Sequence, residues 1–190
     1  MSEIIDIAKL FASGELKFKK GEVDLLNQLV AIVPIDWIVT LQKHLKQVGS
    51  ENLIYYTAKE MGVRWFENMH KYFKISPEDV IKWGINILGI AGWGETSTPT
   101  LNYKEKFYTV KLERGVEAKA FGKTGYAVDH FTRGCYASGA KVLFGGECDA
   151  IELSCVSEGA AFCEFIGQPK KSFDRRDPRV IKQLKLPKGI

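Results

Sequence analysis

The residue types that could do chemistry gather between residues 129 and 167, where two cysteines and a glutamate stand close together. Cys155 follows Glu152 by three positions, and Cys163 follows Cys155 by eight. Alternating apolar and polar residues on either side of a turn predict a hairpin centred near Gly159. Opposed residues in such a hairpin hold their Cβ atoms roughly 4.5–5.5 Å apart. The spacing therefore predicts two neighbouring thiols.

Three interpretations fit this pair of thiols. A disulfide is geometrically allowed, but neither a secretory signal nor a cysteine-dense framework accompanies it. A metal site needs further ligands, and Glu152 is the nearest, although strict alternation points it away from Cys155 unless a bulge or the strand end re-aims it. The thiols could also be ordinary core residues, since free cysteine is among the most buried residue types. The spacing alone leaves all three open.

Further motifs surround the pair: a helix of small residues, Glu152-x-x-Cys155, Cys163, the aromatic Phe165, and the run Phe131-Thr132-Arg133-Gly134. With these motifs, residues 125–167 resemble the 4-vinyl reductase domain family. That family comprises small-ligand-binding domains similar to the sensor domains of phenol-responsive transcription activators and to subunits of the Golgi tethering complex. Before residue 125 the resemblance is weak.

The resemblance implies a structural zinc ion held by Glu152, Cys155, Cys163 and a fourth ligand further upstream. In the phenol-sensing relatives this fourth ligand is a cysteine, and counting back without gaps places it on Asp129, beside His130. Aspartate and histidine are both zinc ligands, so the expected set is completed by Asp129 or His130. A zinc ion with four protein ligands supports the fold and leaves no open position to activate water. The relatives also imply a homodimer.

The elements that must position these residues can be read from periodicity. Residues 129–144 have helical spacing and end at Gly145-Gly146, and their small side chains predict that another backbone approaches closely. That face could also pack a second subunit. Further helices are expected over residues 1–14, 35–48, 53–73 and 77–90, the last with Ser76 as its cap. Strands are expected over residues 110–113, 117–121, 151–155 and 162–166, whereas 23–33 could be a helix or a strand.

This order of elements predicts an α+β fold, with helices packed on one antiparallel sheet and a C-terminal hairpin that carries cysteines. We expect three parts: residues 1–48 as an N-terminal helical and extended segment packed on the domain, 49–169 as the ligand-binding domain, and 170–190 as a basic tail. The net charge of +4 resides in this tail, which has eight Lys or Arg against two Asp. A solvated extension is expected there, and nucleic-acid binding is not, because no helix-turn-helix or zinc-finger spacing accompanies it.

The chain lacks an apolar run long enough to span a membrane, and its N-terminal residues are acidic where a signal peptide is basic, so we expect a cytoplasmic protein. It also lacks the common hydrolase, metalloprotease and dinucleotide motifs. The leading hypothesis is a binding protein, sensory or carrier, for a hydrophobic, aromatic or hydrocarbon molecule, with the ligand contacted by Trp65, Trp83, Trp93 and Tyr126. The alternatives are an accessory reductase acting on a vinyl group, which the family's name implies, and an assembly subunit without a ligand.

Overall fold

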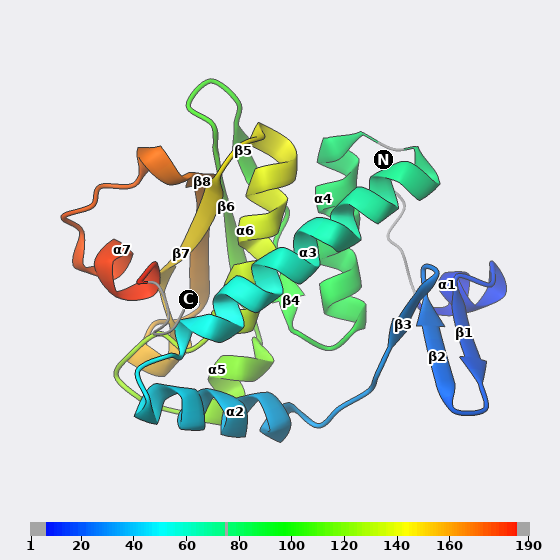
Figure 1. The fold of residues 1–190 in the computed structure, drawn as a ribbon, viewed down its shortest axis with the longest axis horizontal. Coiled ribbons are helices and arrows are strands. Elements are labelled where there is room, and N and C mark those ends of the chain that lie inside the picture. Colours follow the sequence, from blue (N-terminus) through cyan, green and yellow to red (C-terminus); the bar gives the residue numbers. More distant parts are fainter. Residues whose placement is uncertain (1–6, 75, 186–190) are drawn as a thin grey trace.

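The computed structural model describes residues 7–74 and 76–185 and confirms the α+β class. Its main sheet is antiparallel and has the strand order β4-β6-β8-β7, with β5 also paired to β6. Helices cover one face of this sheet, and a short helix lies beyond β7 at its edge (Figure 1). The strands are β4 (Glu95–Thr96), β5 (Thr100–Asn102), β6 (Phe107–Glu113), β7 (Cys148–Ser154) and β8 (Cys163–Pro169).

The helix α6 (His130–Phe144) lies between the sheet and the long helix α3 (Asn52–Phe73), which crosses it (Figure 1). A Cβ atom on Gly134 would lie 2.5 Å from the carbonyl oxygen of Tyr55 and 2.7 Å from the Cβ of Ala58. The predicted close approach of another backbone is therefore confirmed, and the backbone is that of α3. The small-residue face is thus filled within the chain, so the expectation that it is open to a second subunit is wrong.

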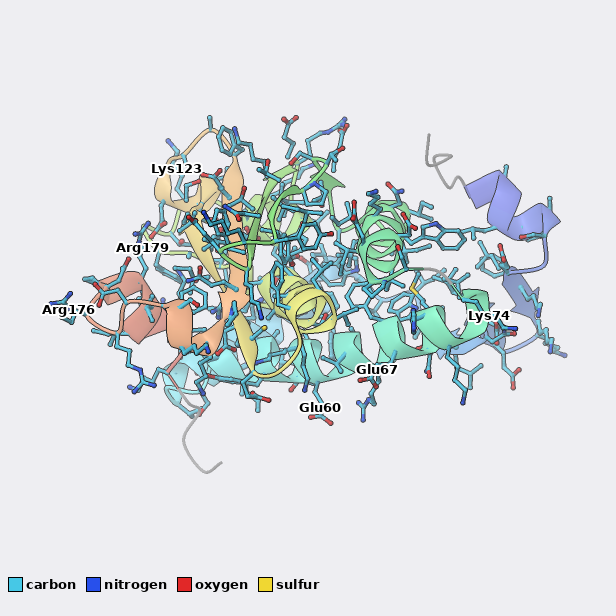
Figure 2. The ribbon with its side chains drawn as sticks, turned by 90° about the horizontal axis from the view of Figure 1, so that it is seen from above. Glu60, Glu67, Lys74, Lys123, Arg176 and Arg179 are labelled. Atoms are coloured by element: carbon cyan, nitrogen blue, oxygen red, sulfur yellow. The ribbon has the colours of Figure 1, made fainter. Side chains whose placement is uncertain are left out.

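The remaining long helices begin and end close to the predicted positions. They are α2 (Ile35–Gln47) and α4 (Pro77–Ile90), and the Oγ of Ser76 accepts a hydrogen bond from the backbone N–H of Asp79 at the start of α4, as its sequence predicted. The outer face of α3 is solvated, with Glu60 and Glu67 pointing away from the body (Figure 2). These helices surround a core that continues onto the sheet.

The prediction of a strand over 117–121 is wrong, because those residues form the helix α5 (Val116–Phe121). Arg114 has a φ of 55°, in the left-handed region, so the chain leaves β6 through a turn and does not form a hairpin there. The helix lets the buried carboxylate of Glu117 accept hydrogen bonds from the backbone N–H groups of Phe131 and Thr132, in the first turn of α6. The first N–H groups of a helix have no partner within the helix and need such acceptors.

The N-terminal part adds a small second sheet, so the ambiguous stretch 23–33 contains strands. Its strands are β1 (Leu16–Lys19), β2 (Glu22–Leu25) and β3 (Gln28–Val30), joined as an antiparallel meander. The short helix α1 (Ile7–Ala12) precedes them, and the rest of the helix predicted over 1–14 lies partly outside the described residues. Figure 1 shows this sheet at the opposite end of the molecule from β7 and α7.

The basic C-terminal segment packs on the domain, so the expectation of a solvated extension is wrong for its described part. After a short 3₁₀ turn at Lys170–Ser172, the helix α7 (Pro178–Gln183) lies against β7. Phe173 and Val180 are buried with Ile151. These apolar side chains help to dock the segment, while its described basic residues remain exposed.

No helix in the part of the chain that the structure describes is long and apolar enough to cross a membrane.

Candidate metal centre and adjoining cavity

Four buried side chains from separate elements converge at one end of the sheet. The group comprises Asp129, Glu152, Cys155 and Cys163, and their ligand atoms all lie within 4.8 Å of one another. Asp129 immediately precedes α6, Glu152 lies in β7, Cys155 follows that strand, and Cys163 begins β8. We call this group the metal cluster.

A strand irregularity brings Glu152 to the same side as Cys155. The β7–β8 register pairs Glu152 with Phe165 and then Ser154 with Glu164, so one residue is inserted between the two pairs. An extra residue in one strand changes which face the following side chains occupy. The sequence predicted that a bulge or a strand end would be needed to re-aim Glu152, and the bulge is present.

The same register places Cys155 and Cys163 at opposed positions just beyond the last paired residues. Their Sγ atoms are 3.9 Å apart. The backbone N–H of Val156 points at the Sγ of Cys163 at 3.3 Å. The turn closes at Gly159, whose φ is 102° and favours glycine. A backbone donor aimed at a sulfur atom stabilises the thiolate form that binds metals.

The structure brings Asp129 into the cluster and leaves His130 outside it. The Oδ1 of Asp129 accepts a hydrogen bond from the backbone N–H of Ala118 at 3.0 Å, and its Oδ2 lies 4.0 Å from the Sγ of Cys155. The Nδ1 of His130 instead lies 3.2 Å from the guanidinium of Arg133. Of the two alternatives for a fourth ligand, only Asp129 has the required position.

The cluster gathers acids whose charges oppose one another. Burial and the neighbouring Asp129 raise the pKa of Glu152 well above its usual range, and burial also raises the pKa of Asp129. The hydrogen bond from Cys163 lowers the pKa of Cys155 to about 6, and the same bond raises the pKa of Cys163. Without a cation, the site must therefore retain protons on several of its ligands.

One oxygen in the cluster has no partner to offset its burial. The Oε1 of Glu152 is buried and, in the described part of the chain, accepts no hydrogen bond. Two thiolates and two carboxylates are a donor set that suits a tetrahedral zinc ion. With a protein ligand at each of its four positions, such a site supports the fold and offers no open position for a substrate.

The backbone on both sides of Glu152 is held by α7. The side-chain amide of Gln183 donates to the carbonyl oxygen of Glu152 at 2.8 Å, and its Oε1 accepts from the backbone N–H of Glu152 at 2.7 Å. Gln183 thus completes the edge of β7 as a neighbouring strand would. This support was missed from the sequence, because nothing in the tail distinguishes Gln183 from its neighbours.

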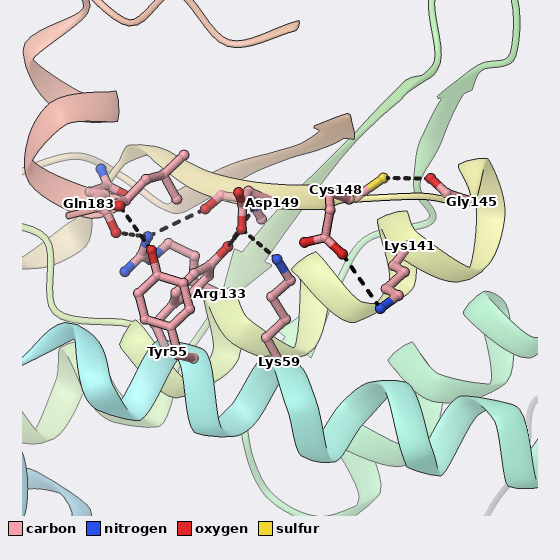
Figure 3. Close-up of polar contacts among 12 residues, drawn as sticks. Tyr55, Lys59, Arg133, Lys141, Gly145, Cys148, Asp149 and Gln183 are labelled. Carbon is pink, nitrogen blue, oxygen red and sulfur yellow. Dashed lines mark hydrogen bonds and ion pairs between the residues drawn. The ribbon is translucent and has the colours of Figure 1, made fainter. Parts of the chain in front are cut away.

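A fully buried arginine joins α6 to the elements around it. The guanidinium of Arg133 donates to the carbonyl oxygen of Gln183 at 2.7 Å (Figure 3). It also donates to the carbonyl oxygen of Ala150 at 3.4 Å and to the Oδ1 of Asn52 at 3.1 Å. It also lies 4.0 Å from the centre of the Tyr55 ring. The motif that contains Arg133 was identified in the sequence, but its partners are distant in the chain and could not be named.

A second polar contact lies beside this arginine, between α3 and β7. Asp149 accepts hydrogen bonds from the hydroxyl of Tyr55 and the amine of Lys59, both at 2.7 Å (Figure 3). The buried charge of Asp149 is therefore paired, and the start of β7 is fixed to α3.

A cavity of about 210 Å³ lies next to the metal cluster. Glu152 belongs to the cluster and also lines the cavity. We call it the Tyr126 cavity. Its wall comes mainly from the ends of α2, α3 and α7 and from the loop before α6; the lining residues are Lys46, Glu51, Asn52, Tyr126, Ala127, His130, Glu152, Glu158, Pro178, Arg179, Lys182 and Gln183. A further hollow of about 310 Å³ shares Glu51, Asn52 and Lys182 with it.

Of the four aromatic residues predicted to contact a ligand, only Tyr126 lines this cavity. Trp65, Trp83 and Trp93 are partly buried against the main core, and Trp93 stacks on Phe131 with 4.0 Å between ring centres. The indole N–H of Trp65 is buried without a hydrogen-bond partner among the described residues. The Tyr126 cavity therefore brings together one of the four predicted residues and several charged residues that the sequence did not single out.

No protein-family model matches the sequence, and no curated protein does. Solved structures do resemble the chain. The phenol-responsive sensory domain of the transcription activator PoxR, crystallised with phenol, is 20% identical, with a TM-score of 0.72 over 90% of this chain and 92% of that one.

Two other solved structures show the same fold at lower similarity. A vinyl-4-reductase family protein from Methanocaldococcus jannaschii is 16% identical, with a TM-score of 0.51 over 73% of this chain and 83% of that one. A trafficking protein particle complex subunit 3 from Naegleria fowleri, covalently bound to palmitic acid, is 10% identical, with a TM-score of 0.53 over 70% of this chain and 91% of that one. The chain therefore has the fold of the 4-vinyl reductase-like domains that its sequence resembles.

Proposed function

We propose that this chain is a small-molecule-binding domain in which a structural zinc ion supports the wall of the ligand cavity. The observation that carries the proposal is the position of Glu152, which belongs to the metal cluster and also lines the Tyr126 cavity. Any ion that fixes the Glu152 carboxylate also fixes that part of the cavity wall. Loss of the metal is therefore expected to weaken ligand binding as well as the fold.

The proposed zinc ligands are Asp129, Glu152, Cys155 and Cys163. The unpartnered oxygen of Glu152 and the buried position of all four side chains support this set. When bound, zinc would offset two of the four negative charges of its ligands and cross-link the start of α6 to the β7–β8 hairpin. Because zinc thiolate sites require reduced cysteines, the proposal places the protein in the cytoplasm.

The proposed ligand is a small aromatic molecule. A cavity of about 150 Å³ suffices to hold benzene, and the Tyr126 cavity has about 210 Å³. Tyr126 offers it an aromatic wall, and Ala127 a small apolar one. The fold of the phenol-responsive sensory domain supports the choice of class, and it favours a sensory role over a carrier role.

Phenol is the first probe. We expect the purified protein to bind phenol in isothermal titration calorimetry, and Ala127→Phe to abolish this binding by filling the cavity. The matched control is Ala91→Phe, which places the same ring at an exposed position after α4. If the two variants bind phenol equally well, or if the wild type binds neither phenol nor other single-ring aromatics, the proposal is wrong.

We also propose that the protein is a homodimer, with an interface at its N-terminal end. Between residues 11 and 37, six large apolar side chains are each more than half exposed: Phe11, Phe18, Leu29, Ile32, Val33 and Trp37. Exposed apolar side chains gathered in one part of a chain are typical of interaction surfaces. We expect light scattering to report two chains for the wild type and one for Ile32→Glu; a monomeric wild type would contradict the proposal.

A further inference from the structure

Two lysines from opposite ends of the chain meet over the ring of Tyr126. The Nζ of Lys46, on α2, lies 2.9 Å from the ring centre, and the Nζ of Lys182, on α7, lies 5.5 Å from it. Among the described residues, neither ammonium group forms an ion pair. Two cations at one side of the Tyr126 cavity therefore have no carboxylate partner among residues 7–74 and 76–185.

The inner wall of the cavity supplies a neutral donor. His130 is only 9% exposed, and its Nδ1 lies 3.2 Å from a guanidinium nitrogen of Arg133. Because arginine can only donate, this Nδ1 must accept, and the proton of the imidazole is therefore on Nε2. That N–H has no hydrogen-bond partner in the part of the chain that the structure describes, while the imidazole lines the cavity.

A third cation lies behind this wall. The guanidinium of Arg133 is buried, and each of its hydrogen bonds goes to a neutral acceptor: two backbone carbonyl oxygens, the amide oxygen of Asn52 and the imidazole of His130. No carboxylate contacts it directly among these bonds. Its charge therefore adds to that of the two lysines at the cavity.

The acids around the cavity limit how much negative charge a ligand can carry. Glu158 is exposed and Glu51 is half-buried, and both line the wall. Glu152 belongs to the metal cluster. These carboxylates would repel a dianion such as a phosphate monoester more strongly than a single carboxylate, so the surroundings favour one negative charge.

We propose that the Tyr126 cavity takes a small aromatic monocarboxylate, with its carboxylate between Lys46, Lys182 and the Nε2–H of His130, and its ring beside Tyr126. This inference rests on the proposed function, because it names the class of ligand for the same cavity. An anion bound in this way would replace the missing partner of both ammonium groups by charge-assisted hydrogen bonds.

The first test compares benzoate with benzamide, which has nearly the same shape and no charge. In calorimetry at neutral pH, we expect benzoate to bind about tenfold more tightly, a difference that corresponds to one charge-assisted hydrogen bond. Added salt should weaken benzoate binding and leave benzamide binding unchanged, because only the first involves exposed charges.

Two substitutions locate the interaction. Lys46→Met and Lys182→Met should each weaken benzoate binding about tenfold and leave benzamide binding and thermal stability nearly unchanged. The matched control is Lys43→Met on the same helix, since the Nζ of Lys43 lies 5.6 Å from the ring of Phe121 and the residue does not line the cavity. This variant should bind benzoate as the wild type does.

The outcomes separate the two proposals. If benzamide or phenol binds as tightly as benzoate, or if the Lys46 and Lys182 variants retain full benzoate affinity, the inference about charge is overturned while an aromatic ligand still fits the cavity. If benzoate, benzamide and phenol all fail to bind, the proposed function fails, and the inference fails with it.

Discussion

The Sγ atoms of Cys155 and Cys163 lie 3.9 Å apart, although the β7–β8 ladder ends one position before the two residues meet. We predict that Cys155→Ser lowers the melting temperature by several degrees, since it removes one of the proposed zinc ligands and with it the stabilisation that a bound metal would give. The control is Cys148→Ser, a buried cysteine outside the cluster whose Sγ points at the carbonyl oxygen of Gly145, a contact that a hydroxyl can keep. If thermal unfolding shows equal decreases in melting temperature for the two variants, Cys155 is an ordinary core thiol like Cys148.

The position of Asp129 predicts how zinc affinity depends on the fourth ligand. Asp129→Ala should weaken zinc binding at least about tenfold, because it leaves only three protein ligands. His130→Gln should keep both the stoichiometry and the affinity, since His130 lies outside the cluster. Competition with a chelating dye measures both. A His130 variant that loses zinc while the Asp129 variant keeps it would reverse the assignment.

The close contact between α6 and α3 predicts that one added methyl group at Gly134 will strongly lower the stability of the protein. Gly134→Ala should destabilise the protein by about 2 kcal/mol or more, because the added Cβ would overlap the backbone of Tyr55 and the side chain of Ala58. Gly89→Ala is the control, since its Cβ would meet only ordinary contacts at 3.5 Å, and alanine favours a helix. Urea unfolding compares the two variants, and similar stabilities would contradict the close packing.

Glu117 predicts a change of stability with pH. Burial, and then the charge of Asp129, raise the pKa of Glu117 from 4.5 to about 8, although hydrogen bonds from Thr132 and Phe131 act in the opposite direction. Between these values the folded state binds the proton of Glu117 more tightly than the unfolded state. The stability that Glu117 contributes is therefore complete below pH 4.5 and is lost as the pH rises through about 8.

The expected slope is on the order of 1 kcal/mol per pH unit, and Glu117→Gln should remove most of it because an amide does not titrate. Chemical unfolding at several pH values between these limits measures the slope in both proteins. Parallel curves for the wild type and the variant would show that other groups set the pH dependence.

The sequence predicted the elements whose signals are local. The helix caps at Ser76 and Gly145, the small residues of α6 and the turn near Gly159 all act within a few positions, so the corresponding helices and the hairpin were found. The spacing of Glu152, Cys155 and Cys163 likewise belongs to one hairpin, which is why these residues could be expected to meet.

The predictions from sequence were incomplete where contacts between residues far apart in the chain determine the structure. Residues 117–121 are a different case, because glutamate, alanine and lysine favour a helix, so the strand prediction overlooked a local signal. The helix also delivers Glu117 to the first N–H groups of α6, which need acceptors. The composition of the tail predicts a solvated segment, and only the contacts of Val180 and Gln183 with β7 show that it is docked. The Tyr126 cavity is lined by Lys46 and Lys182, which are 136 positions apart in the sequence. Such pairs carry no signal within either segment.

The central claim is that Asp129, Glu152, Cys155 and Cys163 hold one zinc ion. Native mass spectrometry of the protein, purified under reducing conditions without chelators, tests it most directly. The account predicts the mass of one zinc ion per chain in the wild type and in Cys148→Ser, and no zinc in Cys155→Ser. A wild type that carries no metal under these conditions, or a Cys155→Ser variant that retains it, would contradict the account.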